Sequence, residues 1–138
     1  MTTEKIIGVV IYCSDPRTDK ANLWKHIKAR LIAEDERYAP VGLFGAPVAL
    51  ARPESFPVKF AAVMEDVDFA IQEFSARGRI ILAGHDCGIY RRIPGENEFT
   101  IEDKKNDLIK AAGLLRKRFP QIPVSAHFFL GSRFELVN

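Results

Sequence analysis

The chain has 138 residues, of which 47% are hydrophobic and 28% are charged, and its formal net charge at pH 7 is +2. A chain of this length predicts one domain, 1–138, that buries about 68% of its unfolded surface and needs no disulfide for stability. Because acidic and basic residues alternate along the predicted helices, there is no long basic stripe of the kind that binds nucleic acid.

Membrane insertion and secretion are not expected from this sequence. No apolar stretch approaches the roughly 20 residues of a membrane span. Residues 6–12 are too short for a signal peptide, are preceded by Glu4 and Lys5, and have no small-residue cleavage site behind them. We therefore expect a cytoplasmic protein whose two cysteines are reduced.

The first predicted element is a strand over residues 6–12, an apolar run without alternation that is typical of a central strand in a parallel sheet. A helix capped by Thr18 or Asp19 is expected next. Its buried face would hold Leu23, Trp24, Ile27 and Leu31. A weaker second strand is predicted over residues 41–44, which end in Gly45-Ala46-Pro47.

A second long helix is expected after Ser55, which would cap it, with Pro57 in its first turn and Gly78 at its end. Its apolar stripe comprises Phe60, Val63, Met64, Val67, Ile71 and Phe74. Residues 79–83 form another unalternating apolar run and predict the third strand, which leads into a polar loop containing Pro94 and Gly95.

A third long helix is predicted to begin after Thr100, because Asp103 stands where a capping box places its acid. Pro120 would end this helix, behind a basic last turn that complements the helix dipole. Residues 124–130 predict a fourth strand. A turn at Gly131-Ser132 would then lead into an antiparallel edge strand over residues 134–137.

Strand and helix therefore alternate three times, and right-handed crossovers turn this order into an α/β domain. We expect a three-layer sandwich with a mostly parallel central sheet and an antiparallel C-terminal edge strand. Ligands of such sheets bind beyond the carboxyl ends of the strands. Cys13 and His85 both follow predicted strands, so they would meet if those strands, about 4.8 Å apart, are neighbours.

Two short motifs at these strand ends carry the candidate chemistry: Cys-Ser-Asp-Pro-Arg at 13–17 and Gly-His-Asp-Cys-Gly at 84–88. Two thiolates and an imidazole, from Cys13, His85 and Cys87, are suitable ligands for Zn²⁺. His85 and Cys87 are two residues apart, so both side chains point to one side of an extended segment. Asp15 could reach a fourth metal position or its water, and Arg17 could hold Asp15 by a bidentate ion pair.

These motifs resemble those of the β-class carbonic anhydrases. That family carries Cys-x-Asp-x-Arg after its first strand and His-x-x-Cys-Gly after its third. Residues 13–17 match the first motif fully, and residues 84–88 look like the second with one residue missing. The order of strands and helices is similar over nearly the whole chain. The family's Arg-Asn-Ala-Gly segment and its N-terminal helical arm have no counterpart here.

The resemblance implies a zinc site formed by Cys13, His85 and Cys87, beside a catalytic dyad of Asp15 and Arg17. The implied activity is reversible hydration of carbon dioxide to bicarbonate by zinc-bound hydroxide, in a homodimer or higher homo-oligomer. Hydrolysis of carbonyl sulfide or carbon disulfide would use the same hydroxide. The alternative is a non-catalytic carbonic anhydrase-like binding or interaction module, with or without a structural zinc.

Simpler roles stay open for several of these residues. Either cysteine could be a buried core thiol, and the two could form a disulfide if the metal site were empty. Asp15 could cap the first helix. Asp86 could be a solvated loop acid or a partner of His85.

We expect His26 on the surface and His127 in the core or at the sheet edge rather than as metal ligands. Tyr90, Arg91 and Arg92 could attract an anion, but an exposed basic loop is the simpler interpretation.

Overall fold

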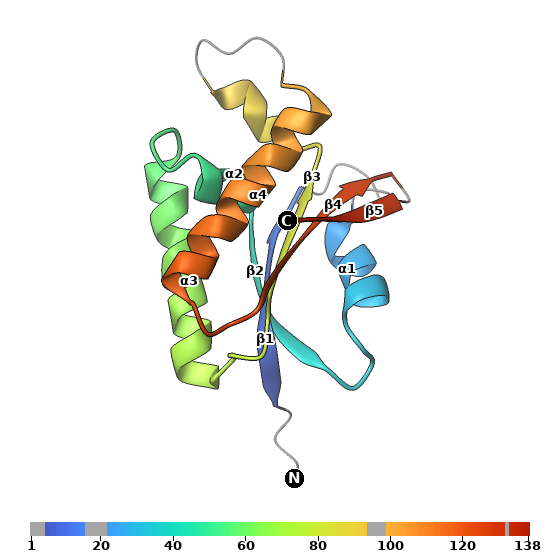
Figure 1. Ribbon diagram of the computed structural model, residues 1–138, viewed down its shortest axis with the longest axis vertical. Helices are drawn as coiled ribbons and strands as arrows, with labels where there is room; N and C mark the ends of the chain where they lie inside the picture. Colours follow the sequence, from blue (N-terminus) through green and yellow to red (C-terminus); the bar gives the residue numbers. More distant parts are fainter. Residues whose placement is uncertain (1–4, 16–21, 94–98, 132) are drawn as a thin grey trace.

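The fold is an α/β domain built on one five-stranded sheet (Figure 1). The computed structural model describes residues 5–15, 22–93, 99–131 and 133–138. The elements in chain order are β1 Ile6–Cys13, α1 Leu23–Leu31, β2 Arg37–Leu43, α2 Ala46–Ala51, α3 Pro57–Phe74, β3 Ile80–His85, the 3₁₀-helix η2 Gly88–Arg92, α4 Ile101–Arg118, β4 Val124–Leu130 and β5 Arg133–Val137.

The strand order is β2-β1-β3-β4-β5. Strands β2, β1, β3 and β4 run parallel to one another, and the edge strand β5 runs antiparallel to β4, as the sequence predicts. The chain passes from β1 to β2 on one side and later returns to β3 on the other, so the order reverses between β1 and β3. Open α/β sheets bind ligands beyond the carboxyl ends of the strands at such a switch point.

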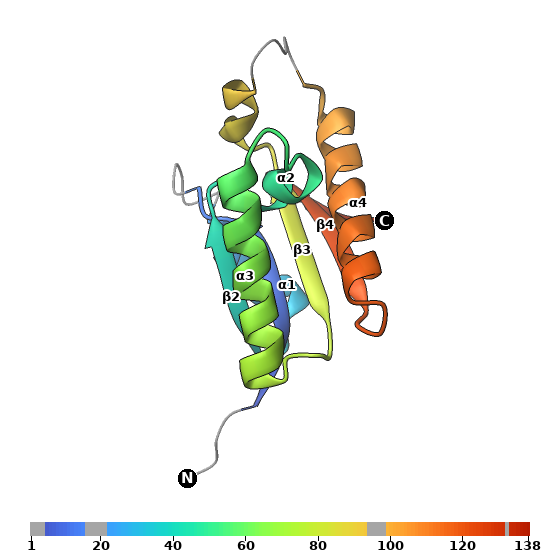
Figure 2. The same ribbon diagram turned by 90° about the vertical axis from the view of Figure 1, so that its left-hand side faces the viewer.

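Helices cover both faces of the sheet, which gives three layers. Figure 2 shows α3 and α4 in front of the sheet with α2 between them, and α1 behind it. The larger core cluster joins α2, α3 and α4 to one sheet face through fully buried residues such as Ile11, Leu82 and Phe128. The smaller cluster packs Leu23 and Ile27 of α1 on the other face. Among the described residues, no helix is long and apolar enough to cross a membrane.

The predicted start of α4 is confirmed. The Thr100 side chain accepts a hydrogen bond from the Asp103 backbone N–H, and the Asp103 carboxylate accepts one from the Thr100 N–H. This reciprocal capping box satisfies two amide groups that the first helical turn would otherwise leave without partners. The predicted end of α4 is also confirmed, since the helix ends at Arg118 with Phe119 as its C-cap, directly before Pro120.

Three other predicted helix ends were wrong. Helix α1 has Asn22 as its N-cap, whereas Thr18 and Asp19 lie outside the described residues. Ser55 does not cap α3, because the chain enters that helix through Phe56, which makes no side-chain cap. The same helix ends before Gly78: Ser75 already adopts a left-handed conformation, with φ 54°.

Strand β2 is longer than predicted and begins at Arg37. It contains Pro40, which has no N–H to donate and therefore made a strand over this segment hard to predict. Proline is tolerated on edge strands, and β2 is the edge of this sheet. The short helices α2 and η2 were not predicted. The predicted loop residues Pro94 and Gly95 and the turn residue Ser132 lie outside the described residues.

Candidate metal centre

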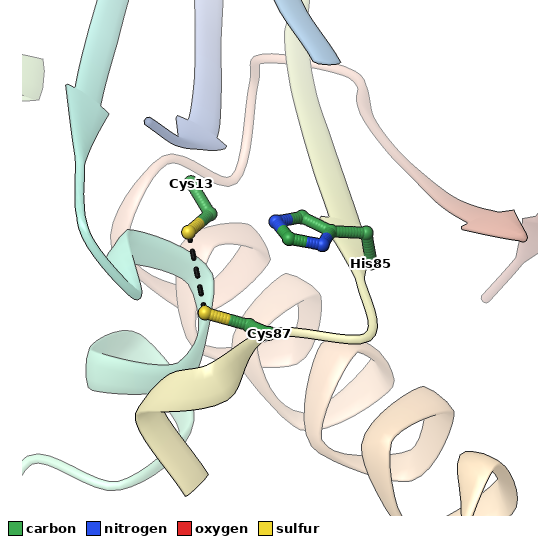
Figure 3. Close-up of side chains that lie close together, drawn as sticks. All are labelled: Cys13, His85 and Cys87. Carbon is green, nitrogen blue, oxygen red and sulfur yellow. Dashed lines mark hydrogen bonds between the residues drawn. The ribbon is translucent and has the colours of Figure 1, made fainter. Parts of the chain in front are cut away.

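The predicted ligands come together at the switch point between β1 and β3 (Figure 3). Cys13 is the last residue of β1, and His85 is the last residue of β3. The pairing of Tyr12 with Ala83 aligns these two strand ends. Cys87 follows in extended conformation and is the N-cap of η2. The sequence interpretation that these side chains meet is therefore confirmed.

The geometry of the three side chains suits a metal ion. The two Sγ atoms are 3.2 Å apart, and one ligand atom from each of Cys13, His85 and Cys87 lies within 4.8 Å of the others. In a tetrahedral zinc site with bonds of about 2.3 Å, two sulfurs are separated by about 3.8 Å. The distance between the two sulfurs thus needs to increase by only about half an ångström for both to bind zinc at that bond length.

Burial and an unpaired nitrogen atom support the same interpretation. Cys13 is 2% exposed and Cys87 is 5% exposed. The Nε2 atom of His85 is buried and has no hydrogen-bond partner within the described part of the chain. A buried polar atom without a partner is costly, and coordination of a metal would satisfy it. The donor set of two sulfurs and one imidazole therefore fits zinc.

The hydrogen bond between the two thiols shifts their pKa values in opposite directions. The hydrogen bond with Cys87 lowers the pKa of Cys13 well below that of a free thiol, and His85 and the backbone N–H of Gly45 act in the same direction against the opposing effect of burial. The same hydrogen bond and burial raise the pKa of Cys87. The Gly45 N–H donates to Cys13 Sγ at 3.2 Å. These directions favour Cys13 over Cys87 as the thiolate of the pair, and metal binding would require Cys87 to lose its proton as well.

A set of polar contacts holds the segment that carries His85 and Cys87 against α4. Asp86 forms an ion pair with Lys104, which identifies it as an exposed loop acid that contacts α4. Tyr90 OH and Arg52 Nε both donate to Oδ2 of the buried Asp107, each at 2.8 Å. Burial and the hydrogen bond to Asp107 raise the pKa of Tyr90, so its hydroxyl stays protonated and donates.

Arg52 and Asp107 were missed by the sequence interpretation. One signal was present: Asp107 lies on the buried face of α4, four residues before Ala111 and next to Leu108. A carboxylate on an apolar helix face is rarely buried without a partner.

The predicted dyad is only partly described. Asp15 is 8% exposed and lies two residues beyond the end of β1. Arg17 lies outside the described residues. Asp15 and Cys87 line a cavity of about 630 Å³, whose other walls include the apolar side chains of Phe44, Phe56 and Ile89 and the cations Lys59 and Arg92. We call this cavity the outer pocket.

A second, much smaller cavity, which we call the inner cavity, also borders the candidate ligands. It offers about 10 Å³ and is lined by Cys13, His85 and Cys87 together with Tyr90 and Asp107. This volume suffices for about one water molecule. All three candidate ligands therefore line a cavity the size of a single water, and one of them, Cys87, also lines a pocket large enough for an organic ligand.

The two remaining histidines take no part in the cluster. His127 is buried in β4, where Nε2 lies 2.9 Å from Ser125 Oγ, and burial lowers its pKa. His26 is on α1, with its ring centroid 6.3 Å from that of Phe129. Both cysteines are free rather than joined in a disulfide.

Comparison with known proteins found no family model, no curated protein and no solved structure that matches this chain.

Proposed function

We propose that Cys13, His85 and Cys87 bind one zinc ion and that the protein catalyses the reversible hydration of carbon dioxide to bicarbonate, as a compact relative of the β-class carbonic anhydrases. The observation that carries this proposal is the convergence of two thiols and one imidazole within 4.8 Å at the carboxyl ends of adjacent parallel strands. The match of residues 13–17 to the family's first motif supports it.

A bound zinc would lower the pKa of a coordinated water to about 7 and so supply a nucleophile at neutral pH. The chain's own residues would prepare that water. A carboxylate oxygen of Asp15 would accept its hydrogen bond and orient it, and Arg17 would fix the direction of that carboxylate through an ion pair. The N–H of Gly45 would hold the charge on Cys13 Sγ and fix that ligand's direction. Carbon dioxide would reach the site through the outer pocket.

Metal content tests the first half of the proposal. Untagged protein purified without chelator should contain about one zinc per chain, and Cys87→Ser should lose it. His26→Gln is the control and should keep its zinc, since His26 lies on α1 and takes no part in the cluster. No stoichiometric metal in folded, reduced protein would refute the zinc site.

Stopped-flow carbon dioxide hydration tests the second half. Asp15→Asn should retain zinc and lose turnover, because the amide can donate a hydrogen bond but cannot hold the negative charge. Turnover equal to that of the wild type would eliminate the role of Asp15. Light scattering on the zinc-loaded protein would test the expected homodimer or higher homo-oligomer.

The non-catalytic module is the second candidate, favoured by the near-complete burial of both sulfurs and by the inner cavity of about 10 Å³. In this case the zinc would be structural, with a fourth protein ligand. X-ray absorption at the zinc edge distinguishes the two: one water ligand supports the enzyme, and four protein ligands in every state support the module.

A further inference from the structure

The outer pocket is too large for the substrate of the proposed reaction alone. Its volume is about 630 Å³. Pockets of roughly 300–1,000 Å³ typically enclose organic ligands, and their walls are mostly apolar with a few well-placed polar groups. Carbon dioxide and bicarbonate would leave most of this space to water.

The walls of the outer pocket combine apolar surface with positive charge. Phe44, Phe56 and Ile89 supply apolar contact area, and the Phe44 side chain is unusually exposed for a phenylalanine, at 53%. Lys59 and Arg92 line the same pocket, and within the described residues neither side chain is in an ion pair. Two cations without ion-pair partners beside an apolar wall favour an anion with an apolar body.

The start of α3 adds to this positive potential. Its N-cap residue, Phe56, lines the outer pocket, and it provides no side-chain cap. The first turn of α3 contains no acidic residue. Free N–H groups and the helix dipole attract an anion at such an end. Asp15 also lines the pocket, and because like charges repel, a bound anion would direct its charged group towards Lys59 and Arg92 rather than towards this carboxylate.

We propose that the outer pocket is a binding site for a small organic carboxylate with an aromatic or branched aliphatic body. The body would pack against Phe44, Phe56 and Ile89, and the carboxylate would bind Lys59 and Arg92. The inference goes beyond the proposed function, because binding requires no metal. If the zinc hypothesis failed, the carboxylate site would still stand. If no carboxylate bound, the zinc hypothesis would likewise still stand.

Calorimetric titration of metal-free, reduced protein with benzoate tests the proposal. We expect a dissociation constant of about 1 mM or tighter for a ligand of this size. Benzamide, the neutral isostere, and acetate, which lacks the apolar body, should each bind about tenfold more weakly or not at all. Added salt should weaken the binding of benzoate, because salt screens its attraction to Lys59 and Arg92.

Matched variants locate the site. Lys59→Ala and Arg92→Ala should each weaken benzoate binding about threefold or more. Arg91→Ala is the control, because Arg91 is the exposed neighbour of Arg92 in η2 and does not line the pocket. Phe44→Ala should weaken benzoate binding. Phe69→Ala removes an exposed aromatic ring on α3 that does not line the pocket, so it should leave benzoate binding unchanged.

Three results would overturn the proposal: no benzoate binding up to ten times the expected dissociation constant, equal binding of benzoate and benzamide, or equal losses for Arg91→Ala and Arg92→Ala. Both arginines are exposed, so circular dichroism should show that these variants fold as the wild type does.

Discussion

Glycine 45 links the conformation of the chain to the candidate metal centre, and its replacement by alanine gives the sharpest test of the structure. Its φ angle is 71°, in the left-handed region, and it donates its N–H to Cys13 Sγ. An L-residue in that conformation costs about 1–2 kcal/mol. An added Cβ would also overlap Cδ1 of Ile89 and lie 2.8 Å from its Cγ2.

Displacing the Ile89 side chain adds about 1–2 kcal/mol of overpacking, so Gly45→Ala should lower the free energy of unfolding by about 2–4 kcal/mol in total. Gly113→Ala is the matched control. Gly113 lies inside α4, and a Cβ there meets nothing within 4 Å. Since alanine is the better helix former, this substitution should raise stability by up to about 1 kcal/mol.

Urea denaturation followed by circular dichroism measures both changes. The double variant Gly45→Ala/Ile89→Ala separates the two contributions, because it removes the overlap and keeps the backbone strain. Relative to Ile89→Ala alone, the second substitution should then cost only about 1–2 kcal/mol. If Gly45→Ala proves as stable as the wild type, neither the left-handed conformation nor the close approach of Ile89 describes the folded protein.

Four further outcomes are expected: two follow from single hydrogen bonds, one from the burial of His127 and one from metal binding. Tyr90→Phe removes a hydrogen bond to the buried Asp107 and should cost about 1.5–3 kcal/mol by urea denaturation; no loss would show that the contact contributes nothing. Thr100→Ala removes the cap of α4 and should cost about 1 kcal/mol in the same assay, and an unchanged value would contradict the capping box. Burial lowers the pKa of His127, so below about pH 6.5 the unfolded chain binds a proton that the folded chain resists. Wild-type stability should therefore fall with pH below that value more steeply than that of His127→Gln, and parallel curves would refute this. Zinc at about 100 times its dissociation constant should raise wild-type stability by about 2.7 kcal/mol and leave Cys87→Ser nearly unaffected; an equal gain in both would exclude Cys87 as a ligand.

The position of the candidate centre was predictable because it depends on strong sequence signals. The unalternating apolar runs before Cys13 and His85 identify buried strands of a parallel sheet. Parallel strands bring their carboxyl ends to one edge, so the two motifs had to meet once β1 and β3 were neighbours. That adjacency could not be read from the runs themselves, because it depends on the path of the crossovers.

The short helix α2 escaped prediction for a physical reason. All of its residues, Ala46–Ala51, are buried, so it has no polar face and no helical period to recognise.

The contrast between Thr100 and Ser55 shows when a predicted cap residue holds. Thr100 has an acid three residues later and caps α4, whereas Ser55 is followed by Val58 at that spacing and caps nothing. A cap residue predicts a helix start more reliably when its reciprocal partner is present.

The short spacing between His85 and Cys87 is explained by the extended backbone at this point. Successive side chains of an extended segment alternate in direction. His85 and Cys87 therefore point towards Cys13, while Asp86 between them contacts Lys104. Lys104 and Asp107 are three residues apart on α4, so one helix face holds Asp86 and, through Tyr90, the start of η2. Two residues of spacing are thus sufficient to join an imidazole and a thiol, provided that α4 anchors the chain on both sides of Cys87.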